Sequence, residues 1–188
     1  MTDFDQQVAQ YQVEWRSKNI ANQKWGEQNR VKRPWILPKE IWEEGLWPGI
    51  RSSSDHPLAA YLEKYDVEKH DGVHNLKSSW VLCANLYFPF QRDKELLVGF
   101  LKDHVSKDIK SVEAIELEYA EKSPLNPTTL LGEPDKGKRG KHQTSPDVAF
   151  LVTTDNGGRG LILTENKFTE HSFYECSGRD KKYGNPDP

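Results

Sequence analysis

The sequence predicts an α/β protein in which helices flank a mixed central sheet. Two short apolar runs, residues 148–152 and 160–164, are separated by a glycine-containing turn and are typical of a β-hairpin. Residues 112–120 alternate apolar and charged side chains, as a half-buried strand does. Residues 93–105 place leucine and phenylalanine at helical spacing. Strands and helices of this kind together predict a layered α/β domain.

The chain divides into a tryptophan-rich N-terminal extension over residues 1–70 and an α/β core over residues 71–188. Residues 3–30 carry a partial apolar stripe among polar side chains and are predicted to be helical. The tryptophans that follow, between proline turns, are Trp35, Trp42 and Trp47. We expect these rings to pack the extension onto the core, and stacking on nucleic-acid bases is the alternative.

A short helix is predicted over residues 57–65, and a turn follows it at residues 70–74. His70 and His74 would face the same way on a helix and could then bind zinc. Gly72 between them makes a helix unfavourable, so we expect both histidines to be solvated loop residues.

The core is predicted to begin with a helix over residues 77–88. Asp93 is a suitable N-cap for a second helix that runs to Val105. Residues 112–120 then form the first strand of the sheet. A loop rich in Pro, Gly and Lys occupies residues 123–144, and a loop of that length is usually functional or mobile.

The hairpin places three charged residues, Asp147, Glu165 and Lys167, at the open end of its two strands. Opposed residues of an antiparallel pair have a constant index sum, which is 312 if Asp147 opposes Glu165 and 314 if Asp147 opposes Lys167. Either even sum puts all three side chains on one face, because side chains alternate along a strand. We therefore predict a loop of about three or five residues, or a bulge, rather than a two-residue turn.

Two carboxylates at one strand end can share a divalent cation such as Mg²⁺, which accepts a few carboxylate oxygens beside water and phosphate. A neighbouring lysine can orient water or stabilise developing negative charge. Only the backbone carbonyl of Asn166 could reach such a cation, so its side chain is expected to be free to vary. The alternative is that Asp147 ends a turn and that Glu165 and Lys167 face solvent.

These residues resemble a known superfamily of nucleases. The residues that carry the resemblance are Pro146-Asp147 and Glu165-Asn166-Lys167, which look like the motif of the PD-(D/E)XK nucleases. Residues 76–88 resemble the helix before the first strand in a restriction endonuclease-like group of this superfamily, and residues 33–38 resemble its lead-in. The resemblance implies a restriction-endonuclease-like core.

The resemblance further implies a Mg²⁺-dependent deoxyribonuclease, of restriction or DNA-repair type, in which Mn²⁺ can substitute. Asp147, Glu165 and the Asn166 carbonyl would hold the metal, and Lys167 would complete the catalytic set. DNA is the implied partner, and a homodimer or a larger nuclease assembly is left open. The alternatives are a catalytically silent nucleic-acid-binding or assembly module on the same fold, and a small interaction domain in which the motif is chance.

The sequence departs from the superfamily in two places. Many members carry a glutamate on the first core helix, whereas residues 77–88 offer only Asn85 as an inward polar side chain. Glu116 or Glu118 of the first strand could supply an additional acid if its face is that of the site. After the hairpin only a short helix over residues 169–177 fits, so the final helix and strand of the core are expected to be incomplete.

A basic run precedes the acid motif, and its members are Lys136, Lys138, Arg139 and Lys141. These cations, interleaved with glycine, are candidates for contacts with the DNA backbone. The alternative is a solvated surface loop. Because the net charge of the chain is −3, attraction of nucleic acid would have to come from a local patch of this kind.

The cysteine content is typical of a cytoplasmic protein. Cys83 and Cys176 are too few for a disulfide framework, and Cys83 lies in an apolar helical run where it is expected to be buried. No apolar run reaches membrane-spanning length, and the polar N-terminus does not look like a signal peptide.

Overall fold

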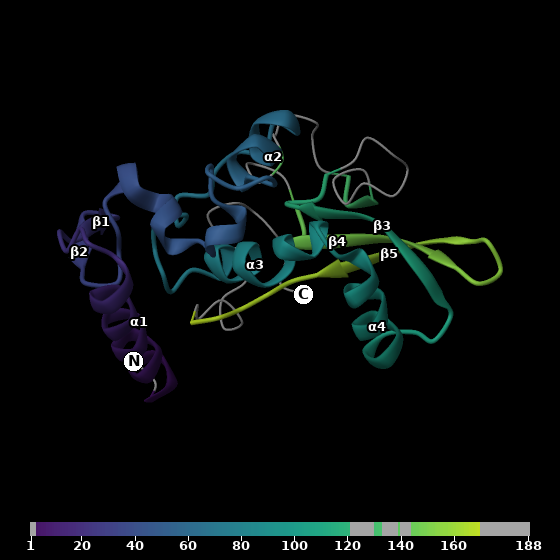
Figure 1. The fold of residues 1–188 in the computed structure, drawn as a ribbon, viewed down its shortest axis with the longest axis horizontal. Helices are drawn as coiled ribbons and strands as arrows, with labels where there is room; N and C mark the ends of the chain where they lie inside the picture. The colour runs from purple at the N-terminus through teal and green to yellow at the C-terminus, as the bar shows by residue number, and fades with distance from the viewer. Residues whose placement is uncertain (1–2, 121–129, 133–138, 140–143, 170–188) are drawn as a thin grey trace.

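A computed structural model describes residues 3–120, 130–132, 139 and 144–169 (Figure 1). The α-helices are α1 (Asp3–Asn19), α2 (Leu58–Lys64), α3 (Ser79–Tyr87) and α4 (Lys94–His104). The 3-10 helices are η1 (Lys39–Gly45), η2 (Pro48–Ile50) and η3 (Phe88–Gln91). The strands are β1 (Gly26–Gln28), β2 (Val31–Arg33), β3 (Ile109–Leu117), β4 (Val148–Thr154) and β5 (Arg159–Thr164).

The main sheet has the strand order β3-β4-β5, and both pairings are antiparallel. An α/β architecture is therefore confirmed, but over the described residues this sheet is antiparallel and not mixed as predicted. The chain connections explain the antiparallel direction of β4 and β5, since a short hairpin can join only antiparallel strands. The predicted first strand is also found, although β3 starts three residues earlier than expected, at Ile109.

Helices α3 and α4 cover one face of this sheet. Phe150 of β4 is buried in one cluster with Val81 of α3 and Leu97 of α4. The same cluster includes Leu46 and Leu62, so part of the N-terminal extension packs directly into the core of the sheet domain. Cys83 is buried here as predicted.

Helix α4 begins where the sequence predicts. The Asp93 side chain accepts a hydrogen bond from the Leu96 backbone N–H at 3.1 Å, which caps the helix. Only part of its apolar stripe is buried, however. Leu97 is fully covered, while Leu96 and Phe100 are 64% and 54% exposed.

The predicted helix over residues 3–30 is wrong in its second half. Helix α1 ends at Asn19, and β1 and β2 form a small antiparallel hairpin. Asn29 and Arg30 in its turn have φ values of 52° and 63°, which is the conformation of a two-residue turn that follows the twist of the strands. The helix prediction, which rested on a partial apolar stripe, extended across this turn because no glycine marked it.

A buried arginine holds α1 against the loops after it. Arg16 is 2% exposed, and its guanidinium donates to backbone carbonyls that would otherwise lie unsatisfied in the interior. The accepting carbonyls are those of Asn22, Lys24, Pro34 and Ile36. Arg16 thereby links α1 to the loops after it, beside the small apolar cluster of Ile20, Leu37 and Leu76.

The turn at residues 70–74 is confirmed, but the interpretation of its histidines is half wrong. His70 is exposed and its Nδ1 lies 3.0 Å from the Gly72 backbone nitrogen. His74 is only 2% exposed, and its Nε2 lies 3.2 Å from the carbonyl oxygen of Glu27 in β1. The buried histidine thus ties the small hairpin to the core.

The tryptophans of the extension pack individually. Trp42 meets Trp80 of α3 edge to face, with ring centroids 6.3 Å apart. The Lys77 ammonium lies over the Trp35 ring, 4.6 Å from the ring centroid. Trp47 remains 46% exposed. Two of the three rings therefore join the extension to the core, as expected.

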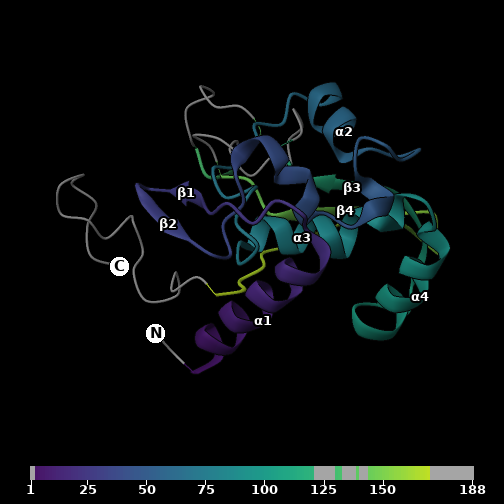
Figure 2. The same ribbon diagram turned by 60° about the vertical axis from the view of Figure 1, so that its left-hand side comes forward.

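Helix α1 lies beside the chain that leaves β5 (Figure 2). The rings of Phe4 and Phe168 contact edge to face at 6.3 Å. Lys77 and Asp5 form a buried ion pair, and the Thr169 hydroxyl donates to the Lys77 carbonyl at 3.1 Å. These contacts position the residues that follow the hairpin. Across the described helices, none has both the length and the apolar character needed to cross a membrane.

Candidate functional site

The register of the hairpin is the one that brings the acid motif together. Val148 pairs with Thr164, so the index sum is 312 and Asp147 comes opposite Glu165. The Thr154 N–H donates to the Gly158 carbonyl at 2.9 Å, which closes a loop of three residues, as predicted. Gly157 in this loop has a φ of 80°, a conformation that glycine adopts without strain.

Asp147 is fixed by the strands on both sides of it. On one side the Glu118 N–H donates to the Asp147 carbonyl at 3.0 Å, and the Tyr119 N–H donates to the Pro146 carbonyl at 3.1 Å. On the other side the Asn166 N–H donates to Asp147 Oδ2 at 2.7 Å. The carboxylate is therefore held between the end of β3 and the residues after β5, partly shielded from solvent.

Glu118 is the third acid at this place. Its side chain is buried, and its backbone adopts a φ of 49° immediately after β3 ends. Burial, followed by the charges of Asp147 and Glu165, raises the pKa of Glu118 to about 8, while Arg139 acts against this shift. Burial makes the largest contribution to this shift, and the charges of Asp147 and Glu165 add to it.

Glu116, the other candidate acid, is occupied elsewhere. Its carboxylate accepts from the Arg139 guanidinium at 2.7 Å and from the Tyr61 hydroxyl at 3.2 Å. The left-handed backbone at Glu118 ends the regular alternation of β3, so these two glutamates do not face the same neighbours. Of the two, Glu118 is the one placed beside the acid motif.

Lys167 and Glu165 form an ion pair through Nζ and Oε1. The lysine side chain is 26% exposed and the glutamate side chain 54% exposed. Residues two apart on an extended chain point the same way, so this pair agrees with the predicted common face. It also means that any cation bound by Glu165 competes with the Lys167 ammonium.

Sequence reasoning missed Tyr87, the residue of α3 that reaches the site. The Tyr87 hydroxyl donates to Asn166 Oδ1 at 3.0 Å. Asn85 is the polar residue that was expected to face inward. Its side chain instead accepts from the backbone N–H of Trp47 at 2.7 Å and donates to the Gly45 carbonyl at 3.0 Å. A tyrosine in an apolar helix carries no signal of its own, because packing in the core is its usual role.

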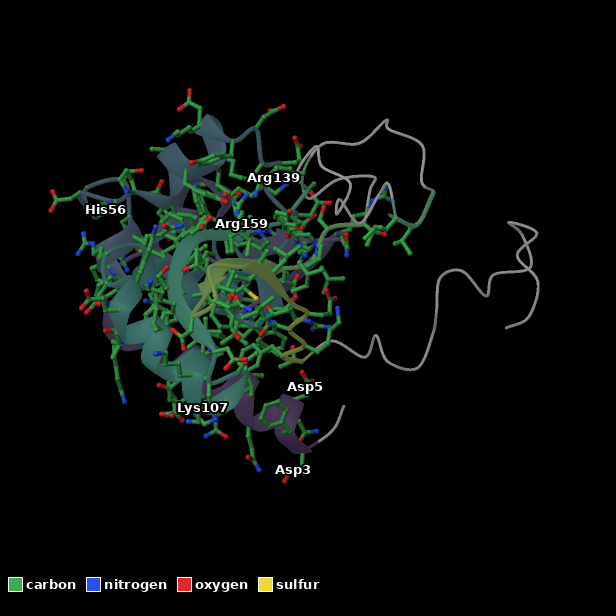
Figure 3. All side chains as sticks on the ribbon, turned by 90° about the vertical axis from the view of Figure 1, so that its right-hand side faces the viewer. Asp3, Asp5, His56, Lys107, Arg139 and Arg159 are labelled. Carbon is green, nitrogen blue, oxygen red and sulfur yellow. The ribbon has the colours of Figure 1, made fainter. Side chains whose placement is uncertain are left out.

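Arg139 is the one member of the predicted basic run that lies within the described residues, and it faces the protein (Figure 3). Its guanidinium donates to Glu116 and to the Leu117 carbonyl, both at 2.7 Å, and to the Glu118 carbonyl at 3.1 Å. The cation thereby anchors its segment to the end of β3. Lys136, Lys138 and Lys141 lie outside the described residues, as do Cys176 and all but the first residue of the predicted helix at 169–177.

Asp147 and Glu165 could bind a cation such as Mg²⁺, which takes few of its ligands from the protein. Over the part of the chain that the structure describes, no group of three or more His, Cys, Asp or Glu side chains is arranged to hold a metal ion. Magnesium needs fewer, since it usually takes one or two carboxylates with waters and substrate phosphates. Asp147 and Glu165 supply two carboxylates at adjoining strand ends.

Comparison with known proteins gives one family. A family model described as Restriction Endonuclease associating with ARP matches residues 7–186. No curated protein and no solved structure matches the chain at a significant level.

Proposed function

The chain belongs to the family described as Restriction Endonuclease associating with ARP, and on that premise we propose that it is a metal-dependent deoxyribonuclease of the PD-(D/E)XK type. The observation that carries the proposal is the hairpin register, which brings Asp147 opposite Glu165, with Lys167 paired to Glu165 at the same end of the sheet. The sequence motif named these three positions.

In the proposed reaction, a water oxygen bonds to phosphorus while the bond from phosphorus to the leaving oxygen breaks. Asp147, Glu165 and the Asn166 carbonyl are the groups that would hold Mg²⁺, or Mn²⁺ in its place. When bound, such an ion lowers the pKa of water and offsets charge on the phosphate. Lys167 carries an ammonium next to these ligands, where it can orient the attacking water and stabilise the negative charge that develops.

A catalytically silent module on the same fold is the second candidate. Its support is that Lys167 is paired with Glu165 and that Arg139 is turned toward the protein. Both cations would then be structural, and the family description, in which the endonuclease associates with ARP, leaves room for members that act in an assembly.

Cleavage of linear and circular DNA in Mg²⁺, in Mn²⁺ and in EDTA separates the two candidates. The deoxyribonuclease proposal predicts metal-dependent cutting that Asp147→Asn and Lys167→Ala each abolish. Asp155→Asn is the matched control, because Asp155 lies in the turn at the opposite end of the same hairpin. Equal cutting by the parent and both site variants would overturn the proposal, and no cutting under any condition would favour the silent module.

A further inference from the structure

The side chain of Asn166 is held on two sides, a role that the sequence did not indicate. Its Oδ1 accepts from the Tyr87 hydroxyl at 3.0 Å, and its Nδ2 lies 3.4 Å from Thr164 Oγ1. The Thr164 hydroxyl in turn donates to the Val148 carbonyl at 3.0 Å. Asn166 therefore links α3 to the adjoining ends of β4 and β5.

Anchoring of the side chain also positions the backbone N–H and carbonyl of Asn166. Its N–H is the donor to Asp147 Oδ2 at 2.7 Å, and its carbonyl belongs to the donor set proposed above. Fixing the side chain restricts rotation of both flanking peptide groups. The position of the Asp147 carboxylate and the direction of the Asn166 carbonyl thus both depend on one amide side chain.

Tyr87 is positioned by packing between helix and sheet. Its ring packs edge to face on Phe150 of β4, with centroids 5.6 Å apart, so helix and sheet together set its position. This packing holds the Tyr87 hydroxyl within hydrogen-bond distance of Asn166 Oδ1.

We propose that Tyr87 is a positioning residue for the nuclease site, acting through Asn166 to hold the Asp147 carboxylate and the Asn166 carbonyl in the geometry that binds the metal. The inference rests on the proposed function and extends it to a residue outside the motif. It gives α3 a role at the site through a tyrosine, where the sequence offers no glutamate. Partners of metal ligands of this kind commonly affect metal affinity or activity by about 10- to 100-fold.

Tyr87→Phe tests this directly, because it removes the hydroxyl and keeps the ring on Phe150. We expect kcat for DNA cleavage to fall by about tenfold or more and the half-saturating Mg²⁺ concentration to rise by a similar factor. The KM for DNA should be unchanged, because Tyr87 is not a DNA contact. Mn²⁺ affinity measured by calorimetry in the absence of DNA should fall in parallel, which gives a readout that is independent of activity.

Two further variants separate positioning from general stabilisation. Tyr61→Phe removes another hydrogen-bonded hydroxyl, which accepts from the Leu117 N–H at 3.0 Å, and it should lower stability without changing the metal dependence. Asn166→Ala keeps the carbonyl and removes the acceptor, so it should reproduce the effect of Tyr87→Phe. The double variant Tyr87→Phe/Asn166→Ala should be no worse than Asn166→Ala alone, since the Tyr87 hydroxyl acts only through the Asn166 side chain.

The outcomes distinguish the inference from the function on which it rests. A parent protein that cuts DNA, with a Tyr87→Phe variant of unchanged kcat and unchanged metal dependence, overturns the inference alone. Additive losses in the double variant also overturn it. A parent that neither cuts DNA nor binds Mn²⁺ overturns the proposed function and the inference together. If Tyr87→Phe does not fold, Asn166→Ala carries the same test from the other side of the hydrogen bond.

Discussion

The backbone N–H of Glu118 donates to the carbonyl of Asp147 at 3.0 Å, and this contact joins the end of β3 to the start of the hairpin. It places the buried Glu118 near Asp147 and Glu165, with the Arg139 guanidinium acting against their charges. Burial, and then the charges of the two acids, raise the pKa of Glu118 to about 8. The carboxyl is therefore largely protonated at neutral pH in the metal-free protein.

Glu118→Gln should change how the stability of the metal-free protein depends on pH. The pKa of Glu118 is raised from 4.5 to about 8 by folding, so its protonated form favours the folded state. This contribution is complete below about pH 4.5 and is lost as the pH rises toward 8. The parent should therefore lose up to about 1.4 kcal/mol per pH unit relative to Glu118→Gln across this window.

Urea unfolding in EDTA at several pH values from 5 to about 8 measures that difference, with Glu113→Gln as a control on an exposed glutamate of the same strand. Parallel curves for the parent and Glu118→Gln would show that Glu118 is not buried among like charges.

Asp5→Ala should destabilise the fold strongly, because it leaves the Lys77 ammonium buried without its carboxylate. Asp5 and Lys77 are 8% and 7% exposed, and breaking a buried pair from one side typically costs about 3 kcal/mol or more. Asp103→Ala is the matched control, since its pair with Lys107 lies on the surface, where such a pair contributes little to stability. Similar losses of unfolding free energy in the two variants would contradict the account of how α1 is attached.

Arg139→Ala should lower the free energy of unfolding by more than it weakens the free energy of DNA binding. The guanidinium bonds to Glu116 and to two carbonyls at the end of β3, and its loss leaves these acceptors unsatisfied. Lys138→Ala should behave in the opposite way if the basic run contacts phosphates, with unchanged stability, weaker DNA binding and a smaller salt dependence. Thermal unfolding and salt-dependent DNA titrations of both variants decide between these roles, and an Arg139→Ala protein of full stability would argue against the anchoring role.

Alanine should have opposite effects at two glycines. Gly157 has a φ of 80°, so Gly157→Ala should cost about 1 kcal/mol or more by straining the loop that sets the hairpin register. Gly99 lies within α4 with open space around its Cα, so Gly99→Ala should raise stability by up to about 1 kcal/mol. Urea unfolding of both proteins checks this, and a Gly157→Ala variant as stable as the parent would contradict the loop geometry.

The sequence predicts the hairpin well because two local signals agree there. The apolar runs and the glycine-containing turn locate the two strands, and alternation along them ties a common face for Asp147, Glu165 and Lys167 to an even register. The three-residue loop of the structure gives that register. The same logic fails at Asn29 and Arg30, which adopt left-handed conformations without a glycine to indicate it. Short-range patterns therefore locate elements best where turn chemistry is carried by glycine or proline.

The acid motif was accessible to sequence reasoning because its members are adjacent to strand ends. Glu118 was only one of two candidates, since its separation from Glu116 depends on a backbone φ of 49° that alternation does not predict. Tyr87 was missed because its role arises from the packing of α3 on β4, a contact between segments about 60 residues apart in sequence. Long-range packing of this kind leaves no local pattern in the chain.

Binding of Mn²⁺ to the protein without DNA tests the central claim most directly. Calorimetric titration of the parent should show a site whose affinity falls by tenfold or more in Asp147→Asn and in Glu165→Gln, with Asp155→Asn unchanged. Lys167→Ala should not weaken binding, because it removes the ammonium that pairs with Glu165. Undiminished Mn²⁺ affinity in both carboxylate variants would show that these acids do not form a metal site.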